Sequence, residues 1–83
     1  MAGPGTISVG KYLGTQDLSA ASGTALTPTA GARVAVISEA SGGNVEIAFG
    51  SSGTVHTIPS PIVIDSDLDG IEVTGDIHVS YFG

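Results

Sequence analysis

Apolar and polar residues alternate in three stretches of the second half of this chain. Residues 45–49, 71–73 and 76–82 each carry a large apolar side chain at every second position. Side chains of a β-strand point to opposite faces in turn, so this pattern predicts strands with one face buried. No stretch of ten or more residues has apolar positions at helical spacing. The pattern therefore predicts an all-β protein.

Shorter apolar runs supply the remaining strands. Arg33–Ser38 is apolar at successive positions, which is typical of a central strand, and Val55–Ile58 and Ile62–Asp65 are two further strands. Clusters of Gly, Ser, Asn and Pro separate them, and Thr74-Gly75 predicts a tight turn that makes a closing hairpin. The result is a small antiparallel β-sandwich or open barrel of six to seven short strands. Its predicted core is Val34, Val36, Val45, Ile47, Ile71, Val73, Ile77 and Val79.

The first third of the chain has a different composition. Residues 1–32 are rich in Gly, Ala, Ser and Thr and suggest an extended arm with one possible short strand, Ile7–Leu13, ahead of a β domain at 33–83. Ordering each backbone residue costs about 1–2 kcal/mol of conformational entropy. The arm has few large apolar side chains, and their burial does not offset this cost over its full length. We therefore expect the arm to contact a neighbouring chain. The interface residues predicted are Ile7, Val9, Tyr12, Leu13 and Leu26.

The charge content narrows the classes of partner. Only 12% of the 83 residues are charged, and the formal net charge is −6. Two basic residues, Lys11 and Arg33, do not make a phosphate-binding patch, so no nucleic acid is expected. No apolar run is long enough to span a bilayer, and the first residues lack a signal-peptide pattern. We expect a chain kept in the cytoplasm until it is assembled, with surfaces that lie against other protein; an extracellular β domain is the alternative.

One segment matches part of a calcium-binding pattern. In DSDLDGIEVTGD, carboxylates occupy positions one, three, five and twelve and glycine position six, which gives Asp65, Asp67, Asp69 and Asp76 as candidate ligands. The calcium-binding pattern has Glu at position twelve and a helix after the loop. Here position twelve is the shorter Asp76, and strands follow. The preferred interpretation is an acidic turn. The chain has no cysteine. A zinc site needs three or four ligands, and no third ligand follows His56 or His78 at the spacing of a known zinc motif, so neither a metal nor another cofactor is expected.

Catalysis is not expected either. Serines and threonines concentrate in turns and the arm, and no glycine-rich phosphate loop precedes a helix. No carboxylate is predicted in an apolar pocket that would suit acid–base chemistry. The sequence therefore favours a non-enzymatic protein.

Residues 31–83 resemble a known class of proteins. The strand ARVAVISEA, a Gly/Asn turn, NVEIAFGSSGT, IPSPIVID and LDGIEVTGDIHVSYFG follow one another as in the small all-β virion proteins of tailed phages, the capsid decoration or cement proteins. The resemblance implies a virion protein that binds the major capsid protein or other virion proteins, often as a homo-oligomer with a trimer favoured, and stabilises the shell. The alternative function is a calcium-stabilised adhesion or carbohydrate-binding β module.

Overall fold

The computed structural model describes residues 10–50, 53–65 and 67–83. Within these residues all regular structure is β, as the sequence predicts. The strands are β1 (Tyr12–Ala25), β2 (Val34–Glu39), β3 (Asn44–Phe49), β4 (His56–Pro59), β5 (Ile62–Ile64) and β6 (Ile71–Phe82). The described part of the chain contains no helix that could cross a membrane.

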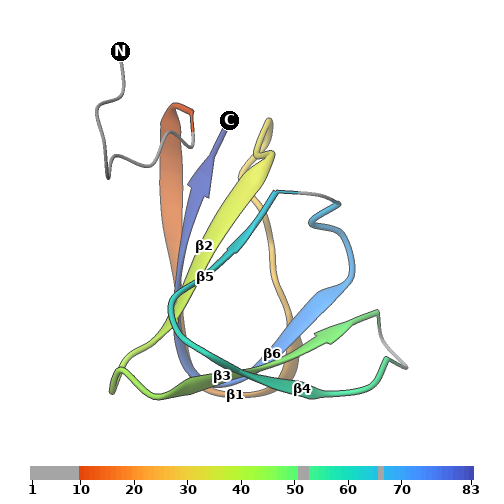
Figure 1. Cartoon of the computed structure of the whole chain (residues 1–83). Coiled ribbons are helices and arrows are strands. Elements are labelled where there is room, and N and C mark those ends of the chain that lie inside the picture. Colours follow the sequence, from red (N-terminus) through yellow and green to blue (C-terminus); the bar gives the residue numbers. More distant parts are fainter. Residues whose placement is uncertain (1–9, 51–52, 66) are drawn as a thin grey trace.

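The long strand β6 organises the sheet. On one side it pairs antiparallel with β1 along most of its length. On its other side, residues 71–74 pair with β3 and residues 77–82 pair with β2. Strand β4 adds to the outer side of β3, and β5 adds to the outer side of β2. The single sheet therefore forks into two arms: the β2 arm (β5, β2, the second half of β6 and the first half of β1) and the β3 arm (β4, β3 and the remaining halves) (Figure 1).

Both long strands bend where the two arms meet. In β6, Gly75 has φ +113°, and in β1 the register shifts between Leu18 and Ala21. Ala20 has φ +51°, a conformation that costs about 1 kcal/mol for a residue with a Cβ. The Ala20 N–H donates to Oδ1 of Asp76 at 2.8 Å, which holds this bend in place. The predicted tight turn at Thr74-Gly75 is wrong, because the glycine bends a continuous strand and does not reverse the chain.

The core lies on the concave face of this curled sheet, between the arms. Six of the eight predicted core residues are buried there, whereas Val34 and Val36 are only partly buried. Ala35 and Ile37 take the inward positions of β2, each with no exposed area. Both faces of β2 are apolar, so its sequence does not show which face is buried. Phe49, also expected to face inward, is 53% exposed, and Ala48 is buried beside Ile47.

Part of residues 1–32, the segment predicted to be an extended N-terminal arm, is a strand of this sheet. Residues 12–25 form β1, and Leu26 is 6% exposed within the core. Irregularities between Tyr12 and Gly14, between Leu18 and Ala21 and between Ala21 and Thr24 break the alternation of side chains, so the strand has no period of two in its sequence. The description of residues 12–26 as an arm is therefore wrong. Ile7 and Val9, with the start of the expected strand Ile7–Leu13, lie outside the described residues.

A buried tyrosine attaches the segment after β1 to the core. Tyr81 is 1% exposed, and its hydroxyl donates to Oε1 of Gln16 at 2.6 Å. The Thr27 N–H donates to the same oxygen at 3.1 Å, and the Leu26 N–H donates to the carbonyl of Ile71 at 2.8 Å. Burial raises the pKa of Tyr81 to about 12. These bonds fix the position of residues 26–27 against β1 and β6.

Candidate interaction surface

The outward face of the β2 arm carries a patch of apolar side chains. Phe82 lies between its cross-strand partners Tyr12 and Val34, and the rings of Tyr12 and Phe82 meet edge to face with centroids 5.7 Å apart. One row further along the strands, Val36 pairs with Val63. Tyr12 is 56% exposed and Val63 is 50% exposed. These five residues, which we call the outward patch, span all four strands of the β2 arm without a charged side chain among them.

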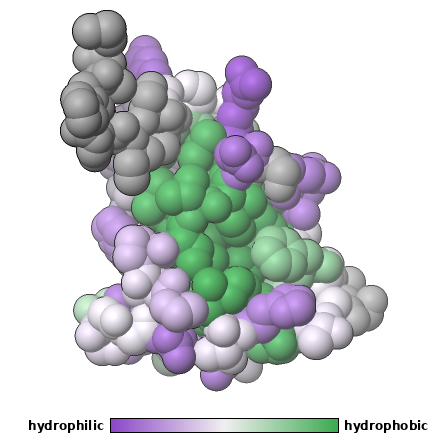
Figure 2. All heavy atoms as spheres, in the orientation of Figure 1, coloured by the Kyte–Doolittle hydropathy of each residue, from purple (hydrophilic) through white to green (hydrophobic). Residues whose placement is uncertain are grey.

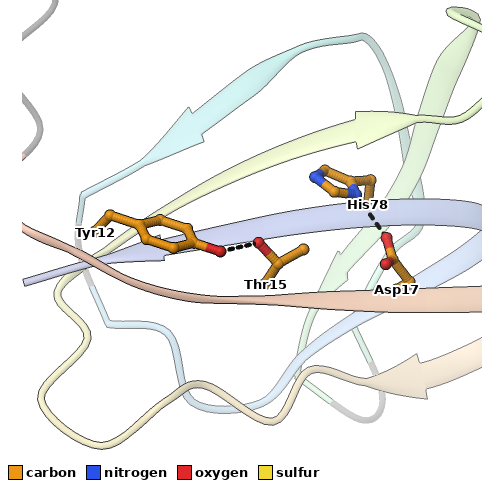
Figure 3. A network of polar contacts seen from close by, with 4 residues as sticks. All are labelled: Tyr12, Thr15, Asp17 and His78. Atoms are coloured by element: carbon orange, nitrogen blue, oxygen red, sulfur yellow. Dashed lines mark hydrogen bonds and ion pairs between the residues drawn. The ribbon is translucent and has the colours of Figure 1, made fainter.

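A row of hydroxyl groups borders the outward patch. Ser80 pairs with Val36 on one side and with Thr15 on the other. The hydroxyls of Tyr12 and Thr15 share a hydrogen bond of 2.6 Å (Figure 3). This bond holds the Tyr12 ring along β1, where it covers part of the strand and also contacts Phe82.

An imidazole–carboxylate pair forms the next row. His78 lies between Asp17 on β1 and Ser38 on β2, and its Nδ1 is 2.6 Å from Oδ1 of Asp17 (Figure 3). The side chains of His78 and Asp17 are 50% and 75% exposed. Nucleophilic catalysis would need Ser38 in hydrogen-bond contact with the ring, and among the described residues no such bond is formed. The bond to Asp17 orients the ring, so its other nitrogen is available to a binding partner.

An open hollow of about 600 Å³ surrounds this pair. Asp17, Glu39 and Asp76 line it together with His78 and Ser38. Asp76 accepts the Ala20 N–H, and hydrogen bonds from Ser41 lower the pKa of Glu39. The hollow is therefore an acidic site beside the outward patch, and its carboxylates suit a cationic group.

The four predicted calcium ligands are not brought together. Asp65, Asp67 and Asp69 line a hollow beside Arg33, whereas Asp76 lines the hollow around His78. The Asp69 N–H donates to Oδ1 of Asp67 at 3.0 Å, which is the hydrogen bond of an acidic turn. Within the described residues, no three His, Cys, Asp or Glu side chains are grouped so that they could hold a metal ion.

The predicted interface residues have different positions. Tyr12 belongs to the outward patch, Leu13 is partly buried, and Leu26 lies in the core. Sequence reasoning missed most of the outward patch, because it assigned Val34 and Val36 to the core. The sequence feature that could have identified these two residues is the run of apolar residues in Arg33–Ser38. A strand that is apolar at successive positions presents apolar side chains on both of its faces.

The free edges of the sheet are poorly suited to adding another strand. Strand β4 ends at Pro59, and β5 has three residues and follows Pro61. Strand β1 is interrupted by three irregularities. Short edges, prolines and bulges are the features that prevent edge-to-edge pairing. A partner of this chain would therefore pack against its side chains and would not extend the sheet.

Apolar side chains also gather on the open side of the curled sheet. Figure 2 shows them in the middle of the view, over β2, β5 and β3, with hydrophilic residues around them. Ile58, Ile62 and Ile64 on β4 and β5 are only partly buried against the core.

On the β3 arm, Phe49 and Val55 are 53% and 59% exposed, and the exposed His56 has its ring 6.1 Å from that of Phe49. No second layer of described residues covers this side.

Comparisons with models of protein families, with curated proteins and with solved structures give no significant match to this chain.

Proposed function

We propose that this chain is a non-enzymatic structural protein of a large assembly, and specifically a capsid decoration or cement protein of a tailed-phage virion. It binds the major capsid protein or other virion proteins and stabilises the shell. The observation that carries the proposal is the exposure of large apolar side chains on both arms of a domain that is already folded. The phage assignment rests on the resemblance of residues 31–83 to decoration proteins.

Size and composition support an assembled state. A domain of about this length buries only some 60% of its unfolded surface, and it gains no stability from disulfides because it has no cysteine. Its surface is also poor in the charges that keep a free monomer apart from other proteins. Contacts with neighbours would supply the missing burial. Many weak contacts repeated over a shell add up, so each one need not be strong.

The exposed side chains of the β3 arm suit contacts with other virion proteins or within a homo-oligomer. Phe49 and Val55 are the most exposed apolar residues of this arm. The resemblance favours a trimer for the homo-oligomer. Because the sheet edges are blunted, such contacts would be made by packing side chains.

A gradient sedimentation experiment tests this proposal. Lysate from the cells that naturally make the chain is separated by size, and the chain is quantified across the gradient by mass spectrometry. We expect it in a fast-sedimenting particle, at a fixed ratio to the most abundant protein of that particle. A chain found only in the slow fractions with other small proteins would contradict the proposal.

A further inference from the structure

We propose that the aromatic and polar side chains of β1 and β6 on the outward face of the β2 arm form a binding site for a neutral oligosaccharide. The sugar lies flat on these two strands, with one ring on Tyr12 and another beside the pair of Asp17 and His78. The site goes beyond the proposed function, because sugar binding requires no contact with a shell protein. It leaves the aliphatic side chains of β2 and β5 available for such a contact.

Three rows of side chains follow one another along β1 and β6 on this face. The register pairs Tyr12 with Phe82, Thr15 with Ser80, and Asp17 with His78. Side-chain hydrogen bonds within β1 and between the strands show that the rows share one face (Figure 3). Phe82 is four residues after His78, which corresponds to about 13 Å along a strand at roughly 3.3 Å per residue. The rows therefore form a strip with the length of a short oligosaccharide.

Tyr12 provides a fixed aromatic surface at one end of the strip. It is 56% exposed, its ring meets that of Phe82 edge to face, and its hydroxyl shares a hydrogen bond of 2.6 Å with Thr15. The ring is thus held at both ends and loses little freedom when a ligand binds. The face of an aromatic ring carries partial negative charge, and the C–H groups on one face of a sugar ring are weakly positive, so the two pack favourably.

The pair of Asp17 and His78 provides hydrogen-bond acceptors at the other end. An ionised Asp17 can only accept, so Nδ1 of His78 carries the proton of their 2.6 Å bond, and Nε2 of the neutral ring is an acceptor. The side chain of Asp17 is 75% exposed, and its second oxygen is a further acceptor. Ser38 pairs with His78 from the β2 side and adds a hydroxyl. Neighbouring hydroxyls of a sugar ring would donate to these acceptors.

This mixture of groups favours a sugar over an apolar protein surface. Covering a hydroxyl or a carboxylate costs free energy unless the group finds a new hydrogen bond. A sugar offers C–H groups to Tyr12 and hydroxyls to Thr15 and Ser80, whereas aliphatic side chains would leave these hydroxyls unsatisfied. The carboxylate of Asp17 and the formal net charge of −6 disfavour an acidic sugar, so the ligand class is neutral.

The hollow around His78 extends the strip. Its volume of about 600 Å³ is in the range of ligand sites, and Asp17 and Ser38 belong to both the hollow and the outward face. The strip and the hollow are open to solvent, so a bound sugar is covered on one side only. We therefore expect dissociation in roughly the millimolar range.

Titration of the ¹⁵N-labelled whole chain, followed by NMR, tests this site. The probes are maltotriose, cellotriose, mannotriose and triacetylchitotriose, each up to about 50 mM because weak binding is expected. At least one of them should shift the amide signals of residues 12–17 and 78–82. Tyr12→Ala should weaken its binding about tenfold, the scale of one aromatic contact. Asp17→Ala should weaken it by a similar factor, because it removes both an acceptor and the bond that orients His78.

Two variants serve as controls. Phe49→Ala removes a ring of similar exposure from the β3 arm, and Val63→Glu changes a side chain on β5, two strands away from β6; both should leave sugar binding unchanged. No shift with any of the four trisaccharides would leave this face to a protein contact and would overturn the inference. Unaltered binding by Asp17→Ala, or by a folded Tyr12→Ala, would also overturn it. None of these results depends on a particle, so the proposed function is tested separately.

Discussion

Truncation of Leu26 to alanine tests whether the segment after β1 belongs to the core. Leu26 is 6% exposed, contacts the buried cluster and donates its N–H to Ile71 at 2.8 Å. Leu→Ala substitutions in cores cost about 2–5 kcal/mol, and the loss grows with the cavity that remains. Leu26 lies at the end of a strand and keeps slight exposure, so we expect the lower part of this range, about 2–3 kcal/mol.

That loss is large for this protein. At roughly 0.05–0.15 kcal/mol per residue, a chain of 83 residues has a free energy of unfolding of about 4–12 kcal/mol. Leu26→Ala should therefore lower the melting temperature by roughly 10–20 °C. Urea unfolding followed by circular dichroism measures the change, with Val63→Ala as the control because Val63 is 50% exposed. Ordinary surface substitutions change the free energy of unfolding by less than about 0.5 kcal/mol. A change no larger than this for Leu26→Ala would refute the placement of Leu26 in the core.

Three other predictions follow from the fold. Deleting residues 2–30 should abolish the cooperative thermal transition, because the deletion removes β1 and Leu26. The urea midpoint should fall as the pH rises from about 10 to about 12, since the pKa of an unfolded tyrosine is about 10 and that of folded Tyr81 is about 12; Tyr81→Phe should remove this decrease. Millimolar calcium should leave the melting temperature unchanged, because Asp65, Asp67 and Asp69 line a different hollow from Asp76; an increase of several degrees would favour the calcium-stabilised module.

The alternating segments were the part of the fold that could be predicted. Residues 45–47, 71–73 and 77–79 alternate strictly, and their apolar members are buried as expected. Hydrophobic burial requires this alternation wherever one face of a strand meets the core. The same reasoning fails at β2, because residues 34–37 are apolar on both faces. The inward face there is set by pairing with β5 and β6, which involves residues far away in the sequence.

Strand β1 could not be predicted from side chains. Its position depends on backbone hydrogen bonds to β6, and its irregularities at Gly14 and Ala20–Ala21 interrupt the alternation. Gly75 has positive φ, and a glycine in that conformation is used both in tight turns and in bends of a continuous strand, so the sequence does not distinguish the two. The pairing of Asp17 with His78 joins residues 61 positions apart and follows from the register of β1 against β6. Without β1 in the sheet, neither the outward patch nor the acidic hollow is recognisable.

The claim that this chain stabilises a shell is tested most directly by removing it from the particle and adding it back. Particles depleted of the chain, particles restored with the purified chain, and particles treated with the Val63→Glu variant are heated, and release of their contents is followed by light scattering. The account predicts that depleted particles open at a lower temperature and that the unmodified chain restores the original one, with Val63→Glu restoring it less well. Equal opening temperatures with and without the bound chain would contradict a structural role.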